Sequence, residues 1–217
     1  MYYNLCITIR NTEPQTMLPM RKIKLPIAAL SILLLAAFCT EKLPKYFSEL
    51  LHRAKMTFEN TTDMVEATPI ENRQMNYEYA LINSNKDFEV RYAIRPLDEL
   101  IKTHDEHEKN KKPGDIYIHP NKFYSALFET TVLNISGGQF PEPSMFDSDA
   151  VKREFNADWG ATVLVEVGEE FGQDYKYCLV VAIHKESIAD AYYFYLSDKR
   201  ETITANMDKL FHSLRFK

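Results

Sequence analysis

The sequence has few of the residues that build disulfide frameworks, phosphate-binding loops or covalent catalytic sites. It contains three cysteines, six glycines, six histidines and one tryptophan among 217 residues. An internal disulfide framework is excluded, since Cys6 and Cys39 precede the folded part and Cys178 stands alone in an apolar strand, where a buried thiol is expected. No glycine-rich phosphate loop and no G-x-S-x-G turn occurs. Covalent nucleophilic catalysis therefore finds no support, and no cofactor is predicted.

Basic residues are also scarce, which disfavours nucleic acid as a partner. Residues 1–38 hold four of the 26 basic residues and one of the 31 acidic residues. The rest of the chain therefore carries 22 basic and 30 acidic residues, a net charge of −8. Binding to nucleic acid needs clustered Lys and Arg side chains that neutralise phosphates. We expect an envelope protein or a small ligand as the partner, and no nucleic acid.

Residues 20–39 have the pattern of an export signal. Basic residues in the segment Met20–Lys24 stand directly before an uncharged apolar run, Leu25–Phe38, and small residues close the pattern. We infer that translation starts at Met20 rather than at Met17, so that residues 1–19 are an over-extended start. The chain is therefore expected in the bacterial cell envelope, either periplasmic or lipid-anchored, or outside the cell.

Three fates of this signal are open. The segment Leu34–Cys39 resembles the lipobox of bacterial lipoproteins, in which the Cys is acylated, although Phe38 stands where that pattern has Gly, Ala or Ser. Cleavage near Ala36 to Cys39 by an ordinary signal peptidase is the close competitor. A retained anchor is the third alternative, but the 14 residues of Leu25–Phe38 make a helix of only ~21 Å, against ~30 Å of hydrocarbon. Cys39 is thus the candidate lipid attachment site.

The chain after the signal has the patterns of one mixed domain that follows a leading helix. Helices are predicted from apolar residues at the helical period, and strands from short β-rich runs between turn residues. In chain order the predicted elements are an amphipathic helix at 40–54, a loop with one short strand at 55–74, a hairpin of strands 77–82 and 88–94, a short helix at 97–107, a helix at 120–134, a helix capped by Asp147 that ends at Phe155, strands at 161–167, 175–184 and 189–196, and a terminal helix.

The order of these elements predicts the fold class. The strand 175–184 is apolar on both faces, so we expect it inside the sheet. In the terminal helix, Asp198 is the expected cap, and an apolar stripe continues to Leu214. A hairpin, helices, a three-strand meander and a final helix together predict an α+β fold, in which helices cover an antiparallel sheet as an α/β/α sandwich. Residues 55–217 are expected to form this single domain.

The end of the chain resembles the PsbP-like family. Two aromatic-rich strands precede the terminal helix, which is expected to end in LFHSLRF at 210–216, and MTF at 56–58 is similar to the first strand of that family. The family includes extrinsic subunits of the oxygen-evolving complex, bacterial envelope lipoproteins and a Ran-binding import factor. The resemblance covers the architecture of residues 55–217, and it implies an accessory or binding role, usually without catalysis.

Two histidines and the single tryptophan are candidates for a site. His104 and His107 stand at helical spacing with carboxylates beside them, which suits a divalent metal, although a solvated charged face explains the same pattern. Trp159 follows a predicted helix at a turn into a strand. It is expected either at the mouth of a pocket or as an anchor that holds this turn to the core.

A pair of arginines is a second candidate. Arg91 and Arg95 share one face of the second hairpin strand with Glu89, and this face is expected to be exposed. Two guanidinium groups so placed can bind a carboxylate or a phosphate. Ion pairing on the sheet surface with Glu89 and its neighbours is the alternative.

Three functions remain open from the sequence. The favoured hypothesis is an exported envelope binding or accessory protein without enzymatic activity, which predicts a shallow, aromatic-rimmed surface. The second is a hydrolase of envelope or extracellular polymers that uses carboxylates with perturbed pKa values in a concave site. The third is a membrane-anchored protein whose soluble domain contacts partners at the bilayer.

Overall fold

The computed structural model describes residues 43–217, nearly all of the chain unit Glu41–Lys217. Residues 1–42 lie outside the described residues, and with them the predicted start, the export signal and Cys39. Within 43–217 no helix is both long enough and apolar enough to cross a bilayer. The fate of the signal therefore stays a prediction.

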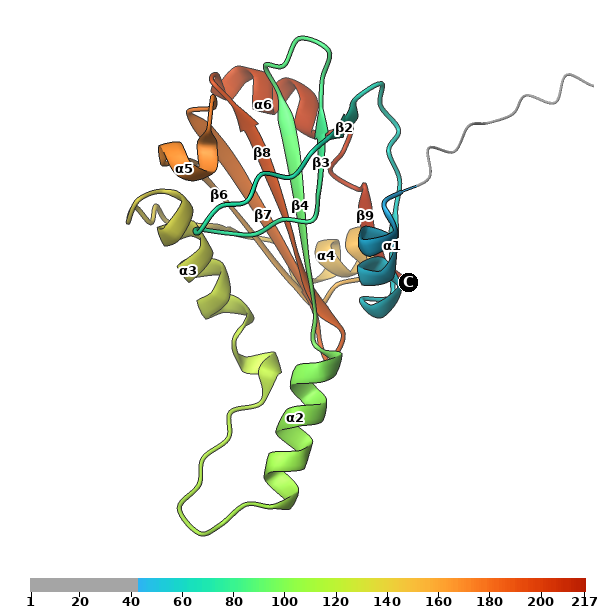
Figure 1. Ribbon diagram of the computed structural model, residues 1–217, viewed down its shortest axis with the longest axis vertical. Helices are drawn as coiled ribbons and strands as arrows, with labels where there is room; N and C mark the ends of the chain where they lie inside the picture. Colours follow the sequence, from blue (N-terminus) through green and yellow to red (C-terminus); the bar gives the residue numbers. More distant parts are fainter. Residues whose placement is uncertain (1–42) are drawn as a thin grey trace, which may run out of the picture. The chain divides into compact units, whose positions relative to one another are not determined.

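A seven-stranded antiparallel sheet occupies the centre of this unit (Figure 1). Tyr and Val are, with Ala, the commonest residues of its longest strands, and bulky aromatic and β-branched side chains pack well on a pleated surface. In spatial order the strands are β2 Val65–Ala67, β3 Tyr79–Ile82, β4 Glu89–Pro96, β8 Ala189–Ser197, β7 Tyr177–Lys185, β6 Trp159–Glu166 and β5 Ser144–Met145. The predicted hairpin is the pair β3–β4, and the predicted meander is β6–β7–β8, so both predictions are confirmed.

The sheet separates two hydrophobic cores, because successive side chains of a strand point to opposite faces. Tyr193 and Tyr195 of β8 belong to the first core, whereas Tyr192 and Phe194 belong to the second. All nine residues of β8 are buried, so both faces are covered. The predicted α+β fold, with helices packed on an antiparallel sheet, is confirmed. The strand β7 lies inside the sheet as expected, and β8 beside it takes the middle position.

Helices close the two cores from opposite sides of the sheet. The first core contains residues of α1 Lys45–Arg53, α4 Ser148–Phe155 and α6 Arg200–Met207, and the second contains residues of α3 Tyr124–Ile135 and α5 Glu169–Gly172. Figure 1 shows α3 and α5 on one side of the sheet and α1 and α4 on the other. The predicted cap of α4 is confirmed, since the Asp147 carboxylate accepts the N–H groups of Asp149 and Ala150.

The end of the chain departs from the prediction. The helix α6 ends at Met207 and has no side-chain cap, so the expected helix through Leu214 with Asp198 as its cap is wrong. The final residues instead form β9 Leu214–Phe216, which pairs with β1 Met56–Phe58 in a separate two-stranded sheet. Pairing between the two ends of the domain overrides the local helical period there. One feature of the PsbP-like resemblance, a helix that ends in LFHSLRF, is thereby removed, and the region 55–74 holds two short strands, β1 and β2, instead of one.

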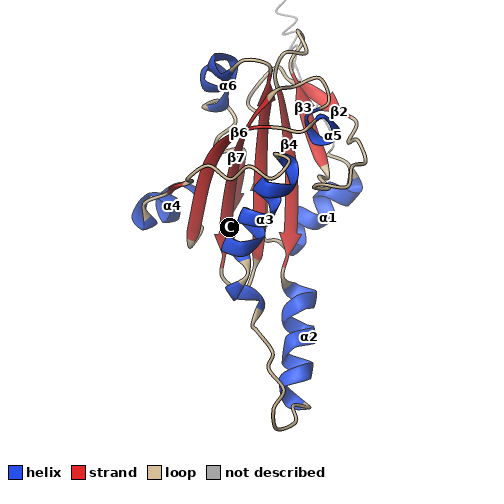
Figure 2. Cartoon of the chain, turned by 90° about the vertical axis from the view of Figure 1, so that its left-hand side faces the viewer, coloured by secondary structure: helices blue, strands red, loops and turns tan. Residues whose placement is uncertain are grey.

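One helix stands apart from both cores. The predicted helix 97–107 is confirmed as α2 Asp98–Lys109, and it extends with the following segment beyond the end of the sheet (Figure 2). Its start is tied to α1, since Arg53 Nε donates to Asp98 Oδ2 at 2.9 Å. The chain returns through a 3-10 turn, η1 Pro120–Lys122, and only then enters α3, so the single helix predicted for 120–134 is divided.

Candidate functional site

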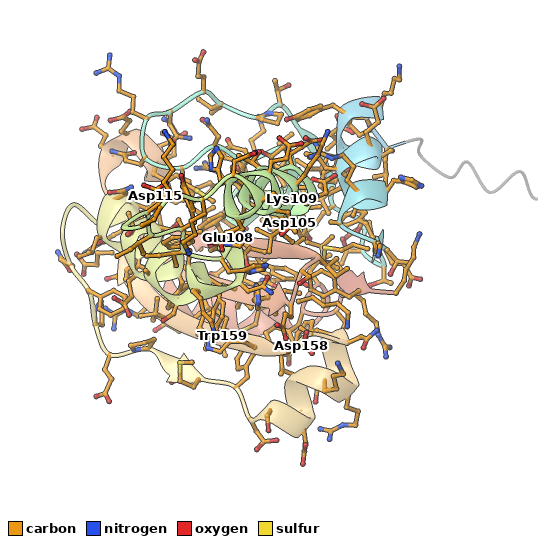
Figure 3. All side chains as sticks on the ribbon, turned by 90° about the horizontal axis from the view of Figure 1, so that it is seen from below. Asp105, Glu108, Lys109, Asp115, Asp158 and Trp159 are labelled. Atoms are coloured by element: carbon orange, nitrogen blue, oxygen red, sulfur yellow. The ribbon has the colours of Figure 1, made fainter. Side chains whose placement is uncertain are left out.

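A cavity of about 540 Å³ opens at the end of the sheet where η1 leads into α3. Its walls come from the η1–α3 segment, the start of β6 and the β7–β8 hairpin. Figure 3 views the molecule from the α2 end, with Asp158 and Trp159 of the cavity wall apart from the charged residues of α2. The residues that line the cavity are His119, Asn121, Lys122, Tyr124, Ser125, Asp158, Trp159, His184, Glu186 and Ser187.

A buried histidine–aspartate pair lies beside the cavity, and His184 is the member of the pair that lines it. His184 and Asp190 are direct partners across β7 and β8, and their Nδ1 and Oδ1 atoms lie 2.7 Å apart. Both residues are almost fully buried, at 3% and 4% exposure. A carboxylate can only accept hydrogen bonds, so His184 Nδ1 donates to Asp190, and Nε2 is the ring nitrogen left for other partners. Within residues 43–217 no protein group forms a hydrogen bond with Nε2, and this atom is not fully shielded from solvent. Because His184 lines the cavity, we infer that Nε2 is accessible from it.

Aromatic rings fix this wall. The Tyr124 ring stacks on His184 with 4.3 Å between ring centroids, and it contacts Trp159 at 4.9 Å. Trp159 is half-buried, and its other ring neighbour is Phe128 of α3 at 5.8 Å. Trp159 thus combines the two roles that its position predicts, because it anchors the start of β6 and lines the cavity.

Polar groups at the rim are held by hydrogen bonds. The Asn121 side-chain amide binds the β7–β8 turn through two hydrogen bonds. Its Oδ1 accepts a hydrogen bond from the Ser187 backbone N–H, with 2.8 Å between N and Oδ1, and its Nδ2 donates to Ser187 Oγ at 3.0 Å. Partial burial would raise the pKa of Asp158, but the Lys152 ammonium and the Glu186 N–H more than offset it, so this pKa is lowered. The rim therefore offers a fixed, ionised carboxylate that accepts hydrogen bonds.

Arg91 does not lie on an exposed face, so that prediction is wrong. The residue as a whole is 1% exposed, because α5 covers this face of the sheet. Its Nε donates to Glu89 Oε1 at 2.6 Å, and its guanidinium group also donates to the Phe171 carbonyl and lies 4.9 Å from the Tyr77 ring centroid. The alternative of ion pairing with Glu89 is correct, but in the interior. Arg91 is therefore enclosed by protein groups.

Arg95 is also engaged by the protein. Its Nη1 donates to Glu78 Oε1 at 2.7 Å. Burial raises the pKa of Glu78, and the charge of Arg95 opposes this shift. The structure thus does not bring Arg91 and Arg95 together as a receptor for an anion.

His104 and His107 lie on α2, outside the cavity. The His104 ring contacts His119 with 4.8 Å between centroids, and the His107 ring contacts Tyr117 at 5.0 Å. Within residues 43–217 no group of three or more His, Cys, Asp or Glu side chains is placed to hold a metal ion. The pair therefore lacks the further ligands that a metal site requires.

Comparison with known proteins leaves the family undecided. No protein-family model matches the chain, and no curated protein matches it either. The resemblance to the PsbP-like family stays a prediction.

Sequence reasoning missed the His184–Asp190 pair, and the reason is one residue of register. Strands that end at His184 and begin at Ala189 suggest that these two residues face each other. In the structure Lys185 pairs with Ala189, which brings His184 opposite Asp190. A shift of one residue changes which side chains share a face. No residue type in this turn signals the register, because the shorter turn depends on Ser187, which adopts a left-handed φ of 60° without being Gly, Asn or Asp.

Proposed function

We propose that the chain is an exported envelope binding or accessory protein, and that its ligand is a small polyhydroxylated molecule such as a saccharide. The observation that carries this proposal is the cavity of about 540 Å³, whose wall is aromatic and whose rim is polar. Ligand sites commonly have volumes of about 300–1,000 Å³ and a few fixed polar groups. This cavity differs from the shallow, aromatic-rimmed surface expected from the sequence, since its rim is polar, but it supports the favoured function by offering space for a ligand.

The chemistry of the wall favours hydroxyl groups as ligands. Tyr124 and Trp159 offer apolar ring surface, which suits the C–H face of a sugar ring. The Asp158 and Glu186 carboxylates accept hydrogen bonds from hydroxyl groups, and such charge-assisted bonds are strong. Lys122 adds one cationic donor, so the site combines donors and acceptors rather than one sign of charge.

The single tryptophan provides the experiment. Because Trp159 is the only Trp in the chain and lines the cavity, its fluorescence reports occupancy. We expect a saturable change in emission with at least one member of a panel of neutral mono- and oligosaccharides, confirmed by calorimetry. Glu186→Gln should weaken binding, whereas Glu142→Gln, at an exposed residue outside the cavity, should not. Unchanged emission and heat for the whole panel would remove the saccharide proposal.

A second candidate function is hydrolysis of an ester on such a ligand, and the His184–Asp190 pair favours it. A carboxylate that orients a histidine, with Nε2 free toward a cavity, is the arrangement of a general base. His184 would take a proton from water while the water oxygen bonds to the acyl carbon, and it would return the proton to the departing alkoxide. Acetate release from acetylated saccharides, abolished in His184→Gln, would support this candidate, whereas binding without release would support the first.

Export and anchoring rest on residues 20–39 and Cys39, which lie outside the described residues. We infer export followed by removal of the signal. Mass spectrometry of the protein from cell envelopes tests this directly. A mature start at Cys39 with acyl mass indicates a lipoprotein, a start just after it indicates simple cleavage, and an intact Met20 indicates the membrane-anchored interaction domain. Detection of residues 1–19 would refute the proposed start.

A further inference from the structure

An apolar groove of about 550 Å³ lies between α2 and the chain segment that returns to α3. It shares η1 with the cavity, since Pro120 lines the groove and Asn121 lines the cavity. Its large apolar side chains are open to solvent, with Ile116 84% exposed and Leu100 57% exposed. The groove is lined by Leu97, Leu100, Thr103, His104, His107, Ile116, Tyr117, Ile118, Pro120, Phe123 and Leu127.

The helix α2 has little to stabilise it in the isolated chain. None of its twelve residues is buried by the described part of the chain. An isolated helix of fewer than about 12–15 residues is marginal in water. Soluble monomers rarely leave a contiguous apolar patch uncovered unless it binds something. These two facts indicate that a partner covers the groove face of α2.

The charge of α2 selects the kind of partner. The helix carries five acidic and two basic residues. Asp98 is already paired with Arg53, but Glu99 and Glu106 are exposed and two turns apart, so the helical period aligns them along one edge of the apolar row. With Lys102 and Lys109 counted, the five acidic and two basic residues leave α2 with a net charge of −3 (2 − 5), so a second copy of this helix or an anionic lipid surface would meet net negative charge. A positively charged partner is complementary to it.

We propose that this groove binds an amphipathic helix with basic flanks, supplied by a partner protein. Such a helix places apolar side chains on Leu100, Phe123 and Leu127, and its Lys or Arg side chains on Glu99 and Glu106. Recognition of this kind uses apolar anchors at i, i+3 or i+4, and i+7. The length of α2, about 18 Å, matches about three turns of the partner. The inference does not depend on the ligand of the cavity.

A synthetic peptide tests the proposal with the full chain. The probe is a fluorescein-labelled helix of about four turns, with Leu at helical spacing on one face and Lys on both flanks. The controls are the same peptide with Glu in place of Lys, and one with the Leu positions scrambled. We expect saturable binding of the Lys peptide by fluorescence anisotropy, at least tenfold weaker binding of both controls, and loss of affinity as salt is raised.

Protein variants locate the binding. Leu100→Asp and the pair Glu99→Lys with Glu106→Lys should each weaken binding of the Lys peptide at least tenfold. Their matched controls, Val65→Asp and Glu142→Lys, replace exposed residues elsewhere and should bind as the wild type does. The charge-reversed pair changes only exposed side chains. It therefore still tests whether the groove binds the peptide, even if circular dichroism shows that Leu100→Asp has lost helix α2.

Four results would overturn the proposal. The first three are that the Lys peptide does not bind, that the Glu peptide binds equally well, or that the groove variants still bind the Lys peptide. The fourth is evidence that something other than a partner helix occupies the groove. The last would be seen as self-association of the chain in sedimentation, or as binding to vesicles of anionic phospholipid, when either is abolished by Leu100→Asp.

Discussion

The buried Arg91–Glu89 pair should be the most sensitive point of the fold. The two side chains are 2% and 11% exposed, and the Arg91 guanidinium group lies against both the Tyr77 and Phe171 rings, at 4.9 and 5.0 Å from their centroids. The perturbation is Glu89→Leu, Arg91→Met and the double variant. Each single change leaves one charge in the interior without its partner, whereas the double change replaces the pair with apolar side chains of similar size.

The expected magnitudes follow from this burial. Removal of one partner from a buried ion pair costs about 3–5 kcal/mol, because the remaining charge is uncompensated. For a domain of this size that loss lowers the melting temperature by roughly 6–20 °C. Replacement of both partners is often close to neutral. Here the double variant also leaves the Phe171 carbonyl without its Arg91 donor, so we expect a loss of about 1–3 kcal/mol, smaller than either single loss.

Urea unfolding, followed by far-ultraviolet circular dichroism and by Trp159 emission, measures these differences. If the two signals change over the same range of urea concentration, unfolding is two-state, and the free energies of unfolding of the variants can be compared. The double-mutant cycle then yields the coupling between the two side chains. Additive losses, or a loss below about 1 kcal/mol for Glu89→Leu, would show that the pair is open to water and would refute the reasoning.

Three further predictions use other parts of the structure. The pKa of Asp158 is lowered in the fold, so its contribution is present above about pH 4 and is lost as the pH falls through the lowered pKa. Asp158→Asn should therefore reduce stability near pH 7 by less than about 1 kcal/mol, since the pair with Lys152 is partly exposed, and the difference from wild type should vanish in acid unfolding curves. Gly160→Ala should lower stability by about 1–3 kcal/mol in urea, because the new Cβ would lie 2.6 Å from Phe146 Cδ2; a neutral result would mean that this ring moves freely. Burial raises the pKa of Cys178, so peptide mapping after iodoacetamide treatment should find this thiol unlabelled in buffer and labelled in urea, and labelling in buffer would contradict its burial.

Local chemistry explains why several elements could be predicted. The Asp147 cap needs only the two N–H groups that follow it within three residues. The hairpin β3–β4 needs only two β-rich runs and a polar turn between them. The end of the chain could not be predicted in the same way, because β9 is a strand only by pairing with β1, and Thr57 pairs with Arg215 across most of the chain.

The sites illustrate the same limit at the level of single side chains. The pattern of β4 correctly places Arg91 on the face opposite Val90, but which face is open depends on α5, and Phe171 of α5 is 80 residues away. The His184–Asp190 pair depends on the turn at Ser187, where one residue decides the register. The exposure expected for Arg91 and the missed His184–Asp190 pair both depend on contacts that the hydrophobic periodicity of a strand does not report.

The sequence by itself determined the α+β class, the hairpin, the meander and the acidic charge, because these depend on composition and on contacts between near neighbours. The tertiary structure alone decided that Arg91 is buried, that His184 meets Asp190 at the wall of a cavity, and that α2 leaves its apolar face open beside Glu99. The physical reason is that burial is set by whichever distant element covers a face, and a local pattern states only which residues share that face.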